Sequence, residues 1–90
     1  MDLETIREQI DNIDKKLVQD LEQRMALVNQ VAHYKKAAGK QVLDPKREQA
    51  LLKKIAGLVD DDTYRSTISA IFTDILKHSR EYQRRVLDEN

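Results

Sequence analysis

Two cationic residues, Arg24 and Lys35, occupy positions where the spacing of the surrounding residues calls for Leu or Ile. Steps of three and four residues, the period of one helix face, connect Leu3, Ile6, Ile10, Ile13, Leu17, Leu21, Arg24, Val28, Val31 and Lys35. At about 100° per residue, all ten fall within an arc of roughly 80°. A buried Arg or Lys is rare unless it is paired. The pattern therefore predicts an anion that meets both cations.

The distance between these two cations suits a small ligand. They are eleven residues apart, so their Cα atoms are separated by about 16 Å along a helix axis, and long side chains could converge between them. Two like charges in a partly dry site repel by a few kcal/mol at an effective dielectric near 20. A dianionic ligand would remove this conflict. Either cation taken alone could instead extend its charge to water or pair with an acid on a neighbouring helix.

Polar residues interrupt the apolar faces of two further predicted helices. Arg47 and Glu48 flank the inward face of the second helix, where they could equally be solvated charges of a first helical turn. On the third helix, Ser79 falls inside the apolar face and Gln83 lies on its rim. A helical Ser commonly donates to a carbonyl of the preceding turn, which is the competing interpretation for Ser79. We expect these residues to share one pocket with the two cations.

Helix start and stop signals predict the elements that position these residues. The first helix should span residues 3–38 and end at Gly39, which suits a left-handed cap. Asp44 and Pro45 form a favourable N-cap and first turn, so the second helix should span about 45–59. The acidic run at 60–62 begins a third helix that should end near residue 88. The predicted fold is all-α, with one long and two shorter helices and no hairpin signal.

The long helix is too long for the other two helices to cover. At 1.5 Å per residue it measures roughly 50 Å, so part of its apolar face would stay exposed in a single chain. We therefore predict a homodimer in which the long helices pack along these faces. A coiled-coil or helical-hairpin interaction module is the alternative that the periodicity leaves open.

Composition narrows the function classes. The 90 residues allow one domain, taken as residues 1–90, and the equal counts of 16 basic and 16 acidic residues argue against nucleic-acid binding. Without Cys and with two widely separated His residues, a metal site is not expected. No apolar run suits a membrane span and no signal peptide is evident, so we expect a cytoplasmic protein.

Five segments, in this order, resemble the all-helical chorismate mutase family over nearly the whole chain. They are residues 6–14 (IREQIDNID), 21–24 (LEQR), 31–35 (VAHYK), 44–48 (DPKRE) and 79–83 (SREYQ). The resemblance implies an intertwined homodimer with two equivalent sites. Each site would be completed by an Arg from the long helix of the other chain, and Arg7 is the matching residue here.

The family's reaction, the Claisen rearrangement of chorismate to prephenate, needs no cofactor and no covalent intermediate. The resemblance implies that Arg24 and the partner's Arg7 would bind the substrate carboxylates, whereas Lys35 and Gln83 would donate to the ether oxygen. Asp44 and Glu48 would receive the ring hydroxyl. Arg47 would order this corner, and Ser79 would contact a carboxylate. Some relatives carry Glu where this chain has Gln83, so we expect a rate without a carboxyl titration from that position.

Two rival functions stay open at this point. Isochorismate-pyruvate lyase shares the fold and most of these cations, but it eliminates pyruvate from a related dianion. We prefer the mutase because the corner formed by Asp44, Arg47 and Glu48 suits the C4 hydroxyl of chorismate. The other rival is a non-catalytic helical docking or regulatory module.

Overall fold

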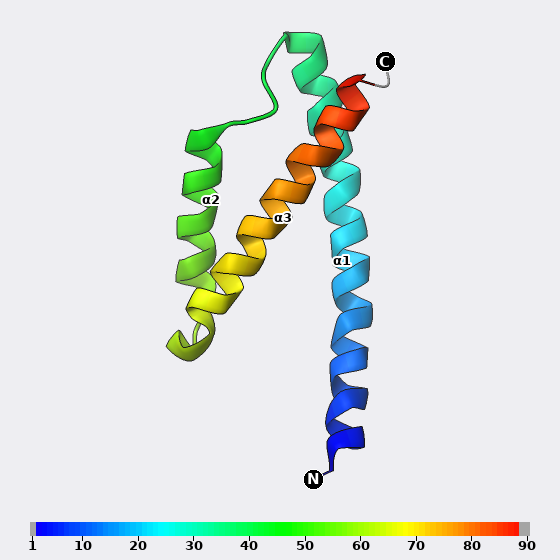
Figure 1. Ribbon diagram of the computed structural model, residues 1–90, viewed down its shortest axis with the longest axis vertical. Coiled ribbons are helices and arrows are strands. Elements are labelled where there is room, and N and C mark those ends of the chain that lie inside the picture. Colours follow the sequence, from blue (N-terminus) through cyan, green and yellow to red (C-terminus); the bar gives the residue numbers. More distant parts are fainter. Residues whose placement is uncertain (1, 89–90) are drawn as a thin grey trace.

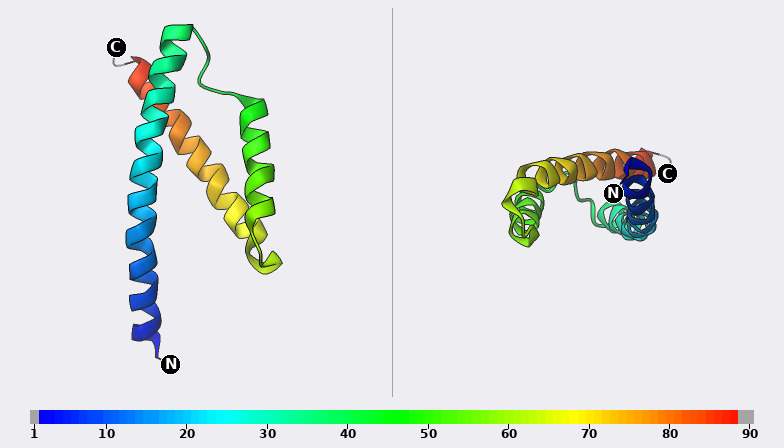
Figure 2. Two further views of the ribbon diagram at one scale, coloured as in Figure 1. Left: turned by 180° about the vertical axis from the view of Figure 1, so that it is seen from behind. Right: turned by 90° about the horizontal axis from the view of Figure 1, so that it is seen from below.

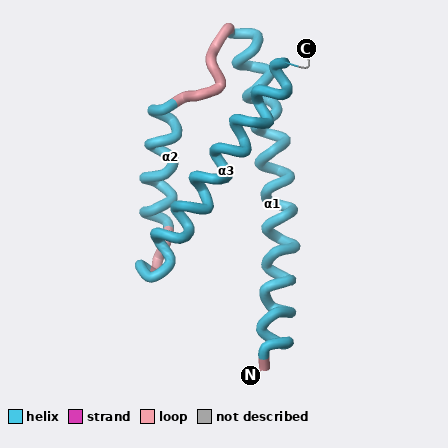
Figure 3. Tube along the Cα trace, viewed as in Figure 1, coloured by secondary structure: helices cyan, strands magenta, loops and turns pink. Residues whose placement is uncertain are grey.

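The computed structural model describes residues 2–88 and contains three helices in this range, with no strand (Figures 1 and 3). They are α1 (Leu3–Ala38), α2 (Pro45–Leu58) and α3 (Asp62–Asp88). The predicted all-α fold with one long and two shorter helices is confirmed. None of the helices in this part of the chain is both long and apolar enough to cross a membrane.

Local capping sets both ends of α1. The Asp2 carboxylate accepts a hydrogen bond of 2.7 Å from the backbone N–H of Thr5, which satisfies one of the free donors of the first turn. At the other end, Gly39 adopts a left-handed conformation with φ of 68°, and its N–H donates to the carbonyl of Lys36. A residue with a Cβ atom would be strained at this φ, so Gly39 ends the helix as its position in the sequence predicts.

The start of α2 also follows from its sequence. Asp44 is the N-cap, and its Oδ1 accepts a hydrogen bond of 3.1 Å from the backbone N–H of Arg47. Pro45 occupies the first turn, where its missing N–H costs no helical hydrogen bond. The polar corner that contains Asp44 and Arg47 is therefore built by the capping interaction itself.

Arg65 of α3 closes the turn between α2 and α3. Its Nε donates to the carbonyl of Ala56 at 2.7 Å and its Nη2 donates to the carbonyl of Val59 at 2.6 Å. These carbonyls lie at the end of α2, where helical partners are missing. The helix ends at Leu58, one residue before the expected boundary, because Val59 is already extended with φ −78° and ψ 118°.

The helices are arranged around α3, which packs against both α1 and α2, whereas α1 and α2 do not pack against each other within the described residues. Figures 1 and 2 show α3 running obliquely from the end of α2 to the C-terminal half of α1. A hydrogen bond of 2.9 Å from the Tyr82 hydroxyl to Asn29 Oδ1 ties α3 to α1. The small apolar core consists of Ala32, Val42, Leu76 and Val86.

The N-terminal half of α1 extends beyond α3 (Figure 1). Every residue from 2 to 23 is exposed in the chain, including apolar residues such as Leu3, which is 59% exposed, and Ile13, which is 62% exposed. Most of the apolar face of this half therefore has no cover from the rest of the described chain. The predicted dimer would supply that cover and stays a prediction.

Candidate active site

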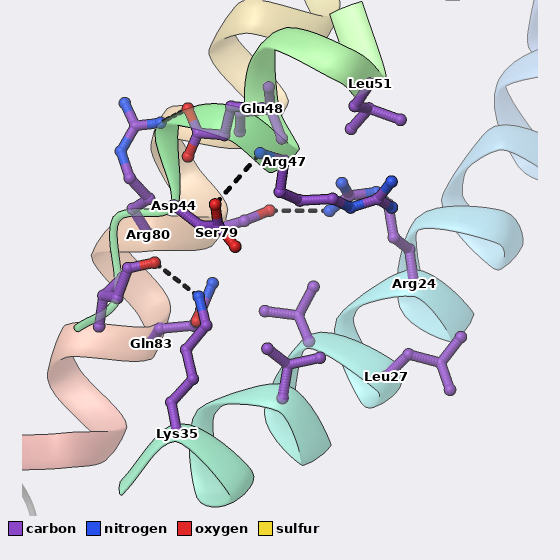
Figure 4. A pocket seen from close by; sticks show the side chains of 14 residues that line it. Arg24, Leu27, Lys35, Asp44, Arg47, Glu48, Leu51, Ser79, Arg80 and Gln83 are labelled. Carbon is purple, nitrogen blue, oxygen red and sulfur yellow. Dashed lines mark hydrogen bonds and ion pairs between the residues drawn. The ribbon is translucent and has the colours of Figure 1, made fainter. Parts of the chain in front are cut away.

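A pocket of about 280 Å³ lies between the three helices, where α1 and α2 face each other across α3 (Figure 4). The packed half of α1 forms one wall, α2 and the preceding loop form a second, and α3 forms the floor. The lining residues are Arg24, Leu27, Val28, Val31, Lys35, Val42, Asp44, Arg47, Glu48, Leu51, Leu76, Ser79, Arg80 and Gln83.

The pocket contains seven of the eight side chains that the sequence singles out as substrate-binding. These are Arg24, Lys35, Asp44, Arg47, Glu48, Ser79 and Gln83. The eighth, Arg7, is exposed on the uncovered half of α1 and does not line the pocket. Arg7 and Arg24 are seventeen residues apart, which corresponds to about 25 Å along the helix axis. Arg7 is therefore out of reach of the pocket in its own chain.

Arg24 is held by α3. Its Nη1 donates to Ser79 Oγ at 2.8 Å, and Ser79 Oγ in turn donates to the carbonyl of Ile75 at 2.7 Å. The single hydroxyl hydrogen of Ser79 is therefore used within its own helix, while the oxygen accepts from Arg24. Ser79 is 5% exposed, so this link is shielded from water. The Ser79 hydroxyl therefore makes both expected contacts at once, because it donates to the preceding turn of α3 and accepts from Arg24.

Positive charge is concentrated in the pocket. Burial lowers the pKa of Arg24, and the nearby positive charge of Arg47 lowers it further. Both effects disfavour the charged guanidinium, and a bound anion would oppose both. The lining residues include four cations and two acids, which leaves a formal net charge of +2. The pocket is therefore suited to a dianion of small size.

Lys35 and Gln83 meet at one end of the pocket, where Figure 4 shows them approaching from α1 and α3. Lys35 Nζ donates to the carbonyl of Val42 at 2.6 Å, which fixes the ammonium and leaves two further N–H donors. Gln83 is 7% exposed, and its Oε1 is buried without a hydrogen-bond partner in the described structure. A buried amide oxygen that receives no donor is costly, whereas the NH2 group of the same amide can donate to a ligand oxygen.

Asp44 and Glu48 form the acidic corner at the start of α2. Asp44 is engaged as the N-cap, whereas Glu48 reaches across to α3 and forms an ion pair with Arg80 through Oε1. Sequence reasoning missed Arg80. It lies about 140° from Ile75 around α3, outside the apolar face, and only the position of α2 brings it to the pocket.

The lining side chains suggest binding and orientation of a ligand. None of the fourteen is a Cys, His or Tyr, and the only hydroxyl, that of Ser79, is already used. The described residues contain no group of three His, Cys, Asp or Glu that could hold a metal ion. What the pocket offers is an array of cationic and amide donors against an apolar wall.

Comparisons with known proteins bear on the family of this chain. A family model described as chorismate mutase type II matches residues 6–84. A chorismate mutase of Methanocaldococcus jannaschii is 31% identical over 88 residues, which cover 97% of this chain and 89% of that protein. A bifunctional chorismate mutase/prephenate dehydratase of Buchnera aphidicola is 33% identical over 89 residues, which cover 98% of this chain but 23% of that protein.

Proposed function

The chain belongs to the chorismate mutase type II family, and we propose that the pocket between α1, α2 and α3 is where it converts chorismate to prephenate. The reaction is intramolecular: one C–O bond breaks, one C–C bond forms, and no atom enters or leaves. An enzyme can accelerate such a step by holding the compact reactive conformer and by stabilising the charge that develops on the ether oxygen. Donors that are already fixed in place are suited to both tasks.

The cations of the pocket would hold the two carboxylates of the substrate. Arg24 is fixed by Ser79, and Arg47 lies close enough to lower the pKa of Arg24. A guanidinium can form two parallel hydrogen bonds to a carboxylate, which sets orientation as well as affinity. Because the pocket carries a net charge of +2, a dianion would relieve the repulsion between its cations.

Lys35 and Gln83 would act on the ether oxygen. The bond from Lys35 to the Val42 carbonyl leaves two ammonium hydrogens for a ligand, and the Gln83 amide is buried beside it. A donor aimed at an oxygen that gains charge in the transition state contributes about 3–4 kcal/mol. Asp44 and Glu48 would accept the ring hydroxyl.

A second copy of the chain would complete each site. Arg7 cannot reach the pocket of its own chain, yet it lies on the uncovered half of α1, whose apolar residues need a partner. If two such halves pack together, the dimer would cover this face and could deliver Arg7 to the partner's pocket. Substrate binding would then depend on dimerisation.

The observation that carries the proposal is the convergence of seven predicted ligand-binding side chains in one pocket of net charge +2. The test follows the loss of chorismate absorbance with wild type, Lys35→Ala and Arg7→Ala. We expect Lys35→Ala to lower kcat by about 100- to 1,000-fold, because it removes a donor to the transition state. Lys36→Ala is the matched control, since Lys36 is exposed on the same turn and does not line the pocket.

Mixing variants tests the shared site. A heterodimer of Lys35→Ala and Arg7→Ala chains has one site with both residues intact, so an equal mixture should recover about a quarter of wild-type activity. A mixture of Lys35→Ala and Arg24→Ala should recover none, because both residues belong to the same chain's pocket. No recovery in the first mixture, despite demonstrated subunit exchange, would contradict the role of Arg7.

A further inference from the structure

Arg80 has no role in the binding scheme described above, although it lines the same pocket. We infer that Arg80 is a positioning residue that aims the Glu48 carboxylate at the substrate's ring hydroxyl and offsets its negative charge. The inference rests on the proposed function, because it assigns Arg80 a task in binding chorismate.

The contact between Arg80 and Glu48 joins two helices at the pocket wall. Arg80 Nη1 donates to Glu48 Oε1, and the two side chains are 23% and 20% exposed, so the pair is largely shielded from water (Figure 4). The other carboxylate oxygen, Oε2, forms no hydrogen bond among the described residues. A carboxylate held through one oxygen presents the other in a fixed direction, as outer partners do for ligating groups.

The neighbouring acid differs in this respect. Asp44 is oriented by the backbone of its own helix, through the N–H of Arg47 at 3.1 Å. Glu48 lies four residues later, in the first turn of α2, and the only hydrogen-bond partner of its side chain among the described residues is Arg80. The orientation of Glu48 therefore depends on α3, and Arg80 is the residue that imposes it.

Charge gives Arg80 a second task. A carboxylate in a pocket for a dianion repels the substrate, and this repulsion is strong where water is partly excluded. Arg80 neutralises Glu48 locally, so that Arg24, Lys35 and Arg47 keep their full attraction for the substrate. Without Arg80, the formal charge of the pocket would fall from +2 to +1, and Glu48 would lose its fixed orientation.

The experiment is a double-mutant cycle on Arg80 and Glu48, measured as kcat and KM for chorismate. We expect Arg80→Met to lower kcat/KM by roughly 10- to 100-fold, mostly through KM, because the donor Lys35 is untouched. In the Glu48→Gln background, the same Arg80→Met change should cost less than about 3-fold, since the carboxylate it serves is gone. Arg80→Lys should recover part of the loss because it keeps the charge.

Arg65→Met is the matched control. Arg65 also joins α2 to α3 through its side chain, but it lies at the other end of α2 and does not line the pocket. Its loss should lower the melting temperature and leave KM unchanged. Circular dichroism of every variant separates misfolding from a change in binding.

Equal losses from Arg80→Met in the Glu48 and Glu48→Gln backgrounds would overturn the inference, as would no recovery by Arg80→Lys in a folded protein. A lower melting temperature with KM unchanged would assign Arg80 to stability alone and also overturn it. A folded wild-type protein that does not convert chorismate would overturn the proposed function first, and the inference with it.

Discussion

The two halves of α1 carry the same apolar period but lie in different surroundings. Residues 24–38 pack against α3, and Ala32 in this half is fully buried. Residues 3–23 are all exposed in the chain, with Leu17 at 53%. Helical periodicity identifies the face that must be covered, whereas the position of α3 decides which part of that face the same chain covers.

The same division separates the cations of α1. Arg24 and Lys35 lie on the packed half and are held by groups outside α1, namely Ser79 and the carbonyl of Val42. Arg7 lies on the exposed half. The packed half therefore provides a fixed binding wall, and the exposed half can contribute only to a neighbouring molecule.

The largest effect should come from placing a charge on the exposed half. Ile10→Asp would introduce a carboxylate into the face proposed to be covered in the dimer, at a cost of several kcal/mol. Association should weaken by roughly 100-fold or more, and activity at low protein concentration should fall with it. Sedimentation and the concentration dependence of the melting temperature measure the change.

Gln9→Asp is the control for this substitution, because it adds the same charge one residue away and about 100° around the helix. It should leave both association and activity close to wild type. If Ile10→Asp instead behaves like Gln9→Asp, the exposed half of α1 is not an interface, and the contrast between the two halves has no functional meaning.

A smaller effect is expected from the link between the packed half and α3. Ser79→Ala removes the acceptor of Arg24 Nη1, and a hydrogen bond to a charged group contributes about 1.5–3 kcal/mol. We expect kcat/KM to fall about 10-fold or more while the helix stays stable, since Ala favours helices. The steady-state kinetics of Ser79→Ala are compared with those of the control Ser66→Ala, which changes an exposed serine of α3. Unchanged kinetics would show that Arg24 does not depend on Ser79.

The smallest effect concerns the cap of the exposed half. Hydrogen bonds from Thr5 lower the pKa of Asp2, so the ionised carboxylate stabilises the folded state. This contribution is present above the ordinary aspartate pKa of about 3.9 and is lost as the pH falls through the lower folded value. Asp2→Asn keeps the cap without this titration, so its helical signal should fall less on acidification.

Circular dichroism between pH 5 and acid pH measures the difference, with Asp11→Asn as the control inside the same helix. A wild-type profile identical to that of Asp2→Asn would mean that the negative charge of Asp2 adds nothing to this half of α1 beyond a neutral cap.

Much of the site could be predicted because its residues break a strong local pattern. Arg24 and Lys35 stand out against the apolar face of α1, and Ser79 stands out against that of α3. Such interruptions are visible without any knowledge of how the helices pack. The structure brings them together in one pocket.

Arg80 could not be found in this way. Its position on α3 lies outside the apolar face, where a charged residue is ordinary, and its partner Glu48 belongs to another helix. The contact between Lys35 and the carbonyl of Val42 is equally hidden, because it depends on the path of the loop between α1 and α2. Both contacts join segments whose relative position no local pattern encodes.

The sequence by itself determined the three helices, through their apolar period and through caps at Asp2, Gly39 and Asp44. These signals are local, because they depend on neighbours within a few residues. Only the tertiary structure decided that α3 covers one half of α1, that Ser79 orients Arg24 and that Arg80 meets Glu48. These outcomes depend on how separate helices pack, and the spacing within one helix carries no information about the angle or register of another.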